Sequence, residues 1–548
     1  MISVQSGEPR TLRPAQPPVT PLATLASAAG AQPSGARPVD AVSVTGIEQR
    51  SGAVLPGDLF VALPGARAHG ARFARDAVER GAVAVFTDAA GAELAGALEV
   101  PVLVRENPRA VLGELSAAVY GNPCERLRIV GITGTSGKTT TSYLVEAGLA
   151  AAGWSTALIG TIETRIGGRR VPSALTTPEA PQLHAMFALM VEQGVDAVVM
   201  EVSSHALALG RVDGVRFAVG AFTNLSQDHL DFHADFEDYF AAKRRLFEPS
   251  SPIAARTAVV CVDDQWGRRL ADGLDAPITV STIEQRASGP DAPAEPEHVA
   301  ASDWSLDGAI SAHGGEQEFT AAGPDGTVDV RLRLPGRYNV ANGLLAVAIC
   351  AAAGVDAAVA APALATVDVP GRMQRVERGQ DFLAIVDYAH KPAALESVIA
   401  TLRGYLADDA PDAPGRLAVV VGAGGDRDAG KRAMMGAVGA HADLLIITDD
   451  NPRSEDPASI RAALRAGALE LPEAARGTVL ELGDRAEAIA AAVNWAQPGD
   501  VVLVAGKGHE TGQEIQGVKY PFDDRDVLAA ALDRRSPQRA DAEDLTVS

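Results

Sequence analysis

A glycine-rich segment with a lysine and two threonines is the part of the chain best suited to phosphate chemistry. The segment Gly131–Thr140 (GITGTSGKTT) overlaps the end of the apolar run Arg128–Thr133 and precedes a helical pattern. Backbone N–H groups of such a loop, together with the N-terminus of the next helix, can cradle phosphates. Lys138 would reach the outer phosphates, and Thr139 would place its hydroxyl on Mg²⁺. The alternative is a glycine-rich turn that ends in a surface lysine, and the strand and helix on either side disfavour it.

A second set of reactive side chains follows two further apolar runs. Glu201 and His205 come after Val195–Met200, which is typical of a buried strand. Because Mg²⁺ prefers oxygen ligands, Glu201 is the stronger metal candidate, whereas a lone histidine is more often a satisfied polar residue. The polar string Phe222–His233 follows the run Arg216–Phe222. Open α/β sheets bind ligands beyond the carboxyl ends of their strands, so we expect these strings and the phosphate loop to share one crevice.

A third set lies near the end of the chain and mixes arginines with carboxylates. The strings Gly424–Arg432, Asp449–Pro457 and Gly506–Glu510 each follow an apolar run. A zwitterionic diamino acid needs cations for its carboxylates and anions for its ammonium groups, and arginine offers a planar fork that matches a carboxylate. A surface salt-bridge network would explain any one string, but three at one sheet edge favour a binding site. Its candidate residues are Arg427, Arg453 and Glu510, with Asp450 and Asn451 beside them.

The apolar runs that position these side chains predict two doubly wound α/β domains. The second begins after the turn Val369-Pro-Gly371, and its strands are expected at Leu383–Val386, Leu417–Val421, Leu444–Thr448 and Val501–Ala505. Shorter segments between Val42 and Val104 indicate a small α/β domain that ends near the turn Gly121-Asn-Pro123. The predicted division is a flexible leader with the start of the first helix over 1–40, then domains over 41–123, 124–368 and 369–548. The Pro- and Ala-rich segment Ala287–Ala301 is interpreted as a surface excursion.

Composition excludes several classes of protein. A length of 548 residues suits about three domains. The net charge of −22 argues against a nucleic-acid partner, whose binding surface is usually basic. Cys124, Cys261 and Cys350 lie far apart, which indicates buried thiols in a reducing compartment. No apolar run approaches the ~20 residues of a transmembrane helix, and Leu22–Ala31 is interpreted as a first helix rather than a signal-peptide core. We therefore expect a cytoplasmic protein with no membrane partner, and a monomer.

The string Thr133–Thr140 (TGTSGKTT) resembles the T-G-T-x-G-K-T-T signature of the Mur ligase family, with Ser136 where asparagine is common. The resemblance covers roughly residues 40–530. It implies a small N-terminal α/β UDP-binding domain, a central P-loop ATPase α/β domain and a C-terminal Rossmann-like doubly wound α/β domain. Val54–Gly65 fits the UDP-binding domain, although Arg50-Ser-Gly52 and His69-Gly70 differ from the D-S-R and D-G patterns common there.

The resemblance also implies an ATP site and its metal ions. Catalytic roles fall on Lys138, Glu201, His205 and Lys243, the last as the lysine that the family carbamylates with CO₂ to N6-carboxylysine. A pair of Mg²⁺ ions would be bound by Thr139, Glu201, His205 and the Lys243 carbamate. On residue types alone, Lys243 in Asp238–Phe247 would lie on a solvated helix face, and Asn339 could be a helix N-cap. The implied ATP-site residues are Gly134, Thr135, Ser136, Gly137, Lys138, Thr139, Thr140, Asn224, Asn339, Asn342, Arg372, Asp387 and His390.

Two further substrate sites follow from the same resemblance. The UDP-muramoyl substrate is assigned to Thr176, Thr177, Ser203 and Arg211. The amino-acid pocket is assigned to Arg427, Asp450, Asn451, Pro452, Arg453, Gly506 and Glu510. Asp450-Asn-Pro-Arg453 matches the members that add meso-diaminopimelate, in which the arginine holds the distal carboxylate.

The implied reaction belongs to cytoplasmic peptidoglycan precursor synthesis. ATP would phosphorylate the D-glutamate carboxylate of UDP-N-acetylmuramoyl-L-alanyl-D-glutamate, and the diaminopimelate amine would attack the acyl phosphate. Alternatives are the same ligase using L-lysine or L-ornithine, a folylpolyglutamate synthetase-like ligase, and an NTP-binding scaffold or switch. A switch would need a guanine-reading N-K-x-D string, and the sequence has no plausible one.

Overall fold

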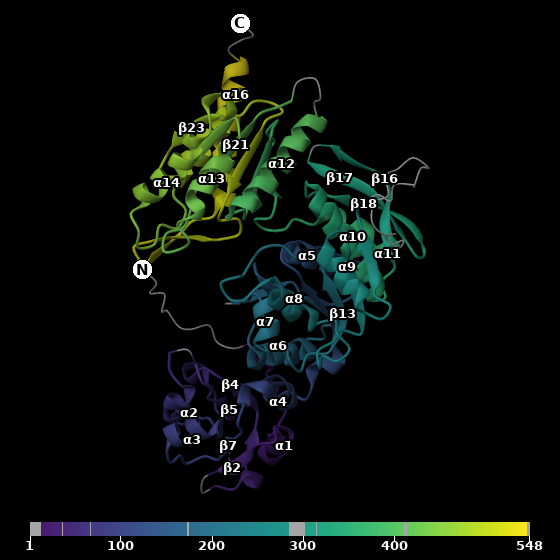
Figure 1. Ribbon diagram of the computed structural model, residues 1–548, viewed down its shortest axis with the longest axis vertical. Helices are drawn as coiled ribbons and strands as arrows, with labels where there is room; N and C mark the ends of the chain where they lie inside the picture. The colour runs from purple at the N-terminus through teal and green to yellow at the C-terminus, as the bar shows by residue number, and fades with distance from the viewer. Residues whose placement is uncertain are drawn as a thin grey trace. The chain divides into compact units, whose positions relative to one another are not determined.

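The computed structural model describes residues 12–34, 37–65, 67–171, 175–283, 302–313, 315–409 and 414–544 (Figure 1). The chain forms two compact units. The first comprises the described parts of Met1–Leu306, with Ala321–Val328 and Asn342–Ala363. The second comprises Asp307–Thr320, Asp329–Ala341 and the described parts of Leu364–Ser548. The predicted excursion at Ala287–Ala301 lies outside the described residues.

The first unit contains a small five-stranded sheet near its N-terminus. Four of its strands are parallel, and β2 pairs antiparallel to β7 at one edge. Their apolar side chains, such as Leu59, Phe60 and Phe86, are fully buried, which confirms the predicted small α/β domain. In sheet order the strands are β2 (Gln32–Ser34), β7 (Val102–Val104), β6 (Ala84–Thr87), β5 (Asp58–Val61) and β4 (Gly46–Glu48). The helices of this region are α2 (Ala74–Glu79), α3 (Ala89–Ala95) and α4 (Leu112–Val119).

The structure shortens the leader predicted over residues 1–40. Strand β1 (Thr20–Pro21) pairs with β3 (Ser43–Val44), and α1 (Leu22–Ala28) follows it at once. Leu22 and Leu25 are buried in the same core as the sheet. The prolines and alanines gave this stretch the composition of a leader, but two buried leucines and strand pairing attach it to the domain. The first helix was predicted correctly.

The central sheet of the first unit carries the phosphate loop. Strands β9, β12, β8, β13, β14 and β15 run parallel, and the hairpin β10–β11 continues the sheet beside β9. The inner strands are almost wholly buried, as expected for a parallel sheet covered on both faces. The strand bounds are β8 (Arg128–Thr133), β9 (Thr156–Ile159), β10 (Thr164–Ile166), β11 (Arg169–Val171), β12 (Ala197–Glu201), β13 (Phe217–Phe222), β14 (Thr257–Cys261) and β15 (Ile278–Ser281).

Helices connect these strands and confirm the predicted strand–turn–helix order. They are α5 (Lys138–Ala151), α6 (Ala180–Glu192), α7 (Ser204–Ala208), α8 (Phe236–Arg244) and α9 (Gln265–Asp272). Helix α8 begins at its N-cap Asp235, whose side chain accepts a hydrogen bond from the Asp238 backbone N–H. Further along the chain come β16 (Trp304–His313), β17 (Glu316–Gly323), β18 (Gly326–Leu332), α10 (Arg337–Ala352) and α11 (Ala357–Ala363).

The second unit contains the second predicted doubly wound sheet. Its strand order is β19-β20-β24-β21-β22-β23, and every pair except β19–β20 is parallel. The strands are β19 (Gln374–Arg375), β20 (Leu383–Asp387), β21 (Leu417–Val421), β22 (Leu444–Ile447), β23 (Thr478–Glu481) and β24 (Val501–Ala505). Two apolar cores lie on its faces, one with Leu402 and Leu464 and the other with Ile489 and Leu528.

Helices of the second unit cover both faces of this sheet. Helices α13 and α14 pack side by side, as Figure 1 shows. The helices are α12 (Pro392–Asp409), α13 (Lys431–Gly439), α14 (Pro457–Glu470), α15 (Arg485–Trp495) and α16 (Asp524–Asp544). A hairpin of β25 (Gly512–Ile515) and β26 (Val518–Pro521) follows β24. The four strands predicted for this domain are confirmed to within one residue at each end.

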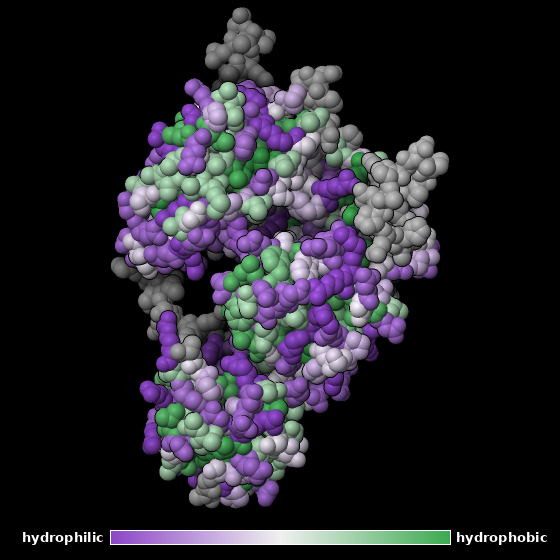
Figure 2. Space-filling view, in the orientation of Figure 1, coloured by the Kyte–Doolittle hydropathy of each residue, from purple (hydrophilic) through white to green (hydrophobic). Residues whose placement is uncertain are grey.

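The surface and the cysteines agree with the composition. Hydrophilic residues cover much of the face seen in Figure 2, with smaller hydrophobic areas between them. All three cysteines are buried and unpaired, as predicted. Among the described residues, no helix is both long and apolar enough to cross a membrane.

Candidate active site

The phosphate loop joins the end of β8 to the start of α5. Gly134 and Gly137 have φ angles of +143° and +86°, which L side chains rarely adopt. A Cβ atom on Gly134 would lie only 1.9 Å from Oγ1 of Thr223. These two glycines therefore allow the tight backbone turn that the phosphate-loop prediction requires.

The segment after β13 holds this loop in place. The Asn224 side chain accepts from the Ser136 N–H at 3.0 Å and donates to the Ser136 carbonyl at 3.1 Å. Thr223 Oγ1 also donates to that carbonyl, at 2.6 Å, and the Thr135 N–H donates to the Asn224 carbonyl at 2.9 Å. The predicted residue Asn224 thus lies against the loop. Thr223 contacts the same loop residue. The sequence analysis gave Thr223 no role, although it lies in the polar string Phe222–His233.

Two lysines share one backbone acceptor in the loop. Nζ of Lys138 donates to the carbonyl oxygens of Gly134 and Thr135 at 2.9 and 2.8 Å, and Nζ of Lys243 donates to the Gly134 carbonyl at 2.8 Å. Lys243 is buried and lies over the ring of Tyr239, so the solvated helix face expected from α8 alone is wrong at this position. Burial, reinforced by the positive charge of Lys138, holds the pKa of Lys243 well below that of an ordinary lysine.

Glu201 ends β12 beside the first turn of α5. Its Oε1 accepts from Thr139 Oγ1 at 3.0 Å and from the Thr161 N–H at 2.8 Å, and its Oε2 accepts from Thr161 Oγ1 at 2.9 Å. A buried carboxylate next to a hydroxyl at the edge of a phosphate loop is an oxygen donor set of the kind that Mg²⁺ prefers. Within the described residues, no group of three or more His, Cys, Asp or Glu side chains is arranged to hold a metal ion. Glu201 and Thr139 are the residues here that would hold Mg²⁺.

His205 lies in α7, in a cluster of rings. Its ring centroid is 4.1 Å from that of Phe232, 4.8 Å from that of His229 and 5.9 Å from that of His233. Burial lowers the pKa of His205, and the neighbouring His233 adds to this effect. The neutral imidazole favoured in this way is the form that can bind a metal ion.

The residues expected at the UDP-muramoyl substrate gather behind Glu201. Thr177 Oγ1 donates to the Glu201 carbonyl at 2.8 Å and accepts from the Ser203 N–H at 3.2 Å. Nη1 of Arg211 donates to the Thr177 carbonyl at 3.4 Å, and the Thr176 and Thr161 hydroxyl oxygens are 3.1 Å apart. Thr177 therefore contacts the predicted metal ligand directly, and the other three expected residues are joined to it through Thr177 or Thr161.

The two asparagines assigned to the ATP site, Asn339 and Asn342, lie one turn apart on α10, and both are buried. Oδ1 of Asn342 accepts from Thr141 Oγ1 at 3.3 Å, and a Cβ atom on Gly137 would come within 2.4 Å of the same oxygen. Asn339 is inside the helix, and its Nδ2 donates to the Pro335 carbonyl at 2.8 Å, so the N-cap alternative is wrong. Thr140, also assigned to ATP, is buried in the first turn of α5.

In the second unit, Asp387 ends β20. Its carboxylate accepts from the backbone N–H groups of Met373 and Ala389 at 2.7 and 2.8 Å. Burial raises the pKa of Asp387, and the nearby Arg372 guanidinium opposes that rise. Arg372 lies over the Tyr388 ring at 4.6 Å from its centroid. The His390 ring contacts the same tyrosine, with centroids 4.5 Å apart and the two rings tilted by 57°. The three expected residues Arg372, Asp387 and His390 thus share one neighbourhood.

The candidate amino-acid pocket has a buried lysine at its centre. Asn451 Nδ2 donates to Glu510 Oε2 at 2.9 Å. Lys507 Nζ donates to Asn451 Oδ1 at 3.1 Å and lies 3.6 Å from Glu510 Oε2 and 3.9 Å from Asp450 Oδ1. A Cβ atom on Gly506 would come within 2.8 Å of Asp450 Oδ2. The structure therefore joins four predicted residues, and it adds Lys507, which the quoted string contains but which received no role.

Arg453 borders this group through the β25 hairpin. Its φ angle is +52°, and it forms an isolated parallel bridge with Ile515. Its Nη1 donates to the Gly425 carbonyl at 2.7 Å, and its Nε is 3.3 Å from Glu514 Oε2. Pro452 precedes it and is buried. Arg427 is exposed, and the described contacts do not join it to the Lys507 group.

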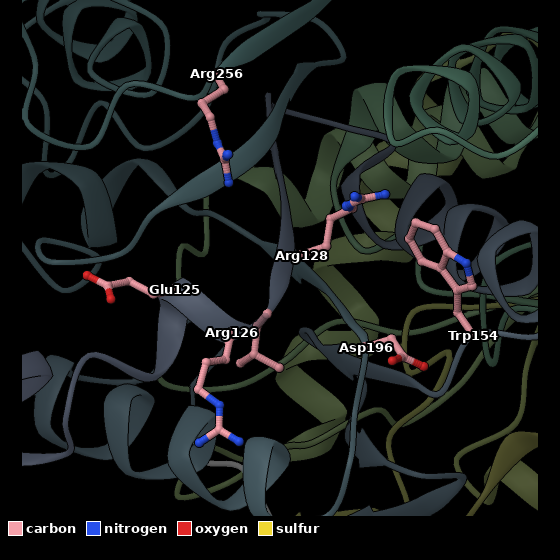
Figure 3. Close-up of a pocket in the computed structure, with 7 residues that line it drawn as sticks. Glu125, Arg126, Arg128, Trp154, Asp196 and Arg256 are labelled. Atoms are coloured by element: carbon pink, nitrogen blue, oxygen red, sulfur yellow. The ribbon is translucent and has the colours of Figure 1, made fainter.

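A hollow of about 460 Å³ lies at the opposite edge of the central sheet, near the amino ends of β8, β12 and β14. Figure 3 shows that the labelled charged side chains point in different directions and do not converge on one point. Because α/β sheets bind ligands at the carboxyl ends of their strands, we place the candidate site at the other edge. The hollow is lined by Glu125, Arg126, Leu127, Arg128, Trp154, Asp196 and Arg256.

Comparisons with known proteins agree with this geometry. Family models described as Mur ligase family catalytic domain, Mur ligase middle domain and Mur ligase glutamate ligase domain match residues 43–120, 132–350 and 371–508. The chain is 53% identical over 481 residues to a UDP-N-acetylmuramoyl-L-alanyl-D-glutamate--2,6-diaminopimelate ligase of Corynebacterium glutamicum, covering 86% of this chain and 89% of the relative. It is 51% identical over 523 residues to the Streptomyces avermitilis ligase of the same name, covering 95% and 98%.

A solved structure with that ligase name matches 91% of this chain and 97% of its own, with a TM-score of 0.65 and 31% identity. A solved folylpolyglutamate synthase structure from Thermotoga maritima shares the fold at lower identity, 17% with a TM-score of 0.54. Along the chain, the three matched segments cover the small N-terminal domain, then the central sheet, then the sheet of the second unit. The chain belongs to the Mur ligase family.

Proposed function

We propose that this ligase joins meso-2,6-diaminopimelate to the D-glutamate carboxylate of UDP-N-acetylmuramoyl-L-alanyl-D-glutamate, with ATP as the energy source. The observation that carries the proposal is the group formed by Asn451, Arg453 and Glu510, which places anionic and cationic side chains together at one sheet edge. The relatives at 51–53% identity, which bear the name of this activity, support it.

The first step transfers a phosphoryl group. A carboxylate oxygen of D-glutamate attacks the γ-phosphorus of ATP, the bond from that phosphorus to the bridging oxygen breaks, and ADP leaves. Lys138 and the loop N–H groups stabilise negative charge on the phosphates, which is the main physical task in this chemistry. Bound Mg²⁺, held by Glu201, Thr139 and His205, would supply further neutralisation of that charge.

Lys243 suits the proposed carbamate. A neutral amine attacks the carbon of CO₂, forms an N–C bond and releases one proton to solvent, which leaves an anionic carbamate. The lowered pKa of Lys243 increases the fraction of its amine that is neutral at a given pH. The carbamate turns the Lys243 side chain from a cation beside Lys138 into an anion. Its oxygens would complete the donors for a second Mg²⁺.

In the second step the amine of diaminopimelate attacks the carbonyl carbon of the acyl phosphate. The C–N bond forms, the C–O bond to phosphate breaks, the nitrogen releases one proton to solvent and inorganic phosphate leaves. Glu510 and Asp450 supply negative charge for an ammonium group, and Arg453 supplies a fork for a carboxylate. Holding both substrates in one geometry removes an entropic barrier to this step.

The family matches also support the proposed domain division of 41–123, 124–368 and 369–548, because each match lies inside one of these ranges. We further propose that Thr176, Thr177, Ser203 and Arg211 bind the UDP-muramoyl substrate. A cytoplasmic monomer remains the proposed state of the protein.

The test is the release of phosphate that depends on the added amine. Purified protein is supplied with ATP, Mg²⁺ and the UDP-muramoyl dipeptide, and the amine is meso-diaminopimelate, L-lysine, L-ornithine or L-glutamate. The proposal predicts phosphate release and a tripeptide product with diaminopimelate far above the other amines. Equal rates with L-lysine would assign the chain to a lysine-adding activity. Phosphate release with L-glutamate, when a folate substrate replaces the UDP-muramoyl dipeptide, would assign it to folate chemistry.

A further inference from the structure

Lys507 is a buried cation that the proposed steps do not use. It follows β24, and its side chain is 0% exposed. Its ammonium group donates to Asn451 Oδ1 at 3.1 Å and to the Gly512 carbonyl at 2.7 Å. Lysine is almost never fully buried unless it is paired, so these acceptors and the carboxylates nearby account for its position.

The ammonium group fixes the orientation of the Asn451 amide. Oδ1 of Asn451 accepts from Lys507 Nζ and from the Glu514 N–H at 2.9 Å, whereas Nδ2 donates to Glu510 Oε2 at 2.9 Å. An ammonium group can only donate hydrogen bonds, so it requires the oxygen end of the amide. The NH₂ end is thereby turned to Glu510. Lys507 and the Glu514 N–H together therefore decide which end of Asn451 meets that carboxylate.

The same cation sets the charge of the pocket. The carboxylates of Asp450 and Glu510 lie 3.9 and 3.6 Å from Lys507 Nζ. Two carboxylates and one ammonium group leave one net negative charge, which one ammonium group of an incoming amino acid would balance. Buried Arg485 also interacts electrostatically with both carboxylates, but its guanidinium is paired with Asp524. Without Lys507 the two carboxylates would therefore lose the cation nearest to both of them.

The network extends from Lys507 to the backbone of Arg453. The Glu514 N–H that donates to Asn451 belongs to β25, and the Glu514 carbonyl accepts from the Arg453 N–H at 3.0 Å. The Arg453 carbonyl in turn accepts from the Gln516 N–H at 2.7 Å. A displacement of Asn451 would therefore reach both the anionic and the cationic side of the pocket.

We propose that Lys507 is a positioning residue for the incoming diamino acid, which orients Asn451 and Glu510 from behind without touching the substrate. This inference rests on the proposed function, because it names the residue that organises the amino-acid pocket of that reaction. It assigns Lys507 to substrate affinity rather than to phosphoryl transfer, since the side chains near its ammonium group, those of Asp450, Asn451 and Glu510, all belong to the amino-acid pocket.

The test compares Lys507→Met and Lys507→Gln with the wild-type enzyme in the phosphate-release assay. Lys507→Met removes the charge and the donor, and Lys507→Gln keeps a donor without the charge. Lys519→Met is the matched control, because Lys519 is an exposed lysine on β26 of the same hairpin region. We expect KM for diaminopimelate to rise by about tenfold or more in both variants, while KM for ATP stays within about twofold. If Lys507→Met does not fold, Lys507→Gln decides the question by the same criteria.

A double-mutant cycle with Asn451→Ala separates positioning from a general structural role. If Lys507 acts through Asn451, then Lys507→Gln raises KM for diaminopimelate much less in the Asn451→Ala background than in the wild type. Fully additive effects, an unchanged KM for diaminopimelate, or equal increases in the KM values for ATP and diaminopimelate would each overturn the proposal. A wild-type enzyme that releases no phosphate with diaminopimelate would instead refute the proposed function itself.

Discussion

Replacing Arg453 by alanine should weaken diaminopimelate binding and leave ATP binding almost unchanged. The Arg453 guanidinium group borders the cluster of Asn451 and Glu510 through the β25 hairpin. In the proposed function it binds the distal carboxylate of diaminopimelate. L-Lysine lacks that carboxylate, so the same substitution should affect L-lysine much less. The comparison of the two amines therefore isolates one charge pair.

The expected size of the effect follows from what the guanidinium contacts. A hydrogen bond to a charged group contributes about 1.5–3 kcal/mol. Arg453 also pairs with Glu514, which is 43% exposed, and pairs of that kind contribute about 0–1 kcal/mol. The substrate replaces this contact, and with a midpoint of about 0.5 kcal/mol for the Glu514 pair the net loss is about 1–2.5 kcal/mol. At about 1.4 kcal/mol per tenfold change, KM for diaminopimelate should rise roughly 5- to 60-fold.

The competition with Glu514 gives a second, opposite prediction. Glu514→Gln removes the charge that competes for Arg453, so KM for diaminopimelate should stay unchanged or fall by up to about fivefold. Steady-state phosphate release with varied diaminopimelate and varied ATP measures both effects. Arg465→Ala, which changes an exposed arginine on α14, is the control. A rise in KM for ATP equal to that for diaminopimelate in Arg453→Ala would refute the pocket assignment.

Three other predictions concern the first unit. Lys243→Ala should abolish turnover, with partial rescue by short carboxylates. Wild-type activity in CO₂-limited buffer should fall as the pH is lowered, because protons compete with CO₂ for the Lys243 amine. Activity that is independent of CO₂ would contradict the carbamate. Burial lowers the pKa of His184 to about 4, so its contribution to stability is present above the unfolded value near 6.5 and is lost as the pH falls toward 4. Wild-type protein should lose roughly 3 kcal/mol over that window, and His184→Gln should flatten this part of a pH series of thermal melts, whereas the exposed-site change His441→Gln should not. Gly134→Ala should raise the dissociation constant of ATP by about tenfold or more in a titration, whereas Gly153→Ala, also at positive φ but with open space around its Cβ, should leave ATP binding intact.

The strands and the phosphate loop could be predicted from sequence because their signals are local. Parallel strands buried on both faces appear as short apolar runs, and β8, β21 and β24 have the bounds that those runs predicted. The phosphate loop needs glycines at fixed places before a lysine, and Gly134 and Gly137 do have positive φ angles. The carboxyl-end rule then predicted that Glu201 would meet the loop, and its hydrogen bond to Thr139 agrees with that.

Burial of single polar residues was decided by tertiary structure. Lys243 has the sequence context of a solvated helix face, yet it is buried against the Gly134 carbonyl, because a helix pattern does not reveal which loop packs on it. The leader-like composition hid a segment in which β2 joins the N-terminal sheet and β1 pairs with β3, since strand pairing depends on residues far away in the chain.

The sequence by itself thus determined the strands, the turn chemistry and the family, because these depend on short-range patterns of residue types. Only the tertiary structure decided that Lys507 stands behind Asn451 and Glu510, and that Arg453 pairs with Glu514. Those contacts join side chains from separate strand ends and a hairpin, and their distances depend on how the sheet brings distant segments together. Hydrogen-bond geometry and desolvation act on that arrangement, so no local pattern in the chain could have specified them.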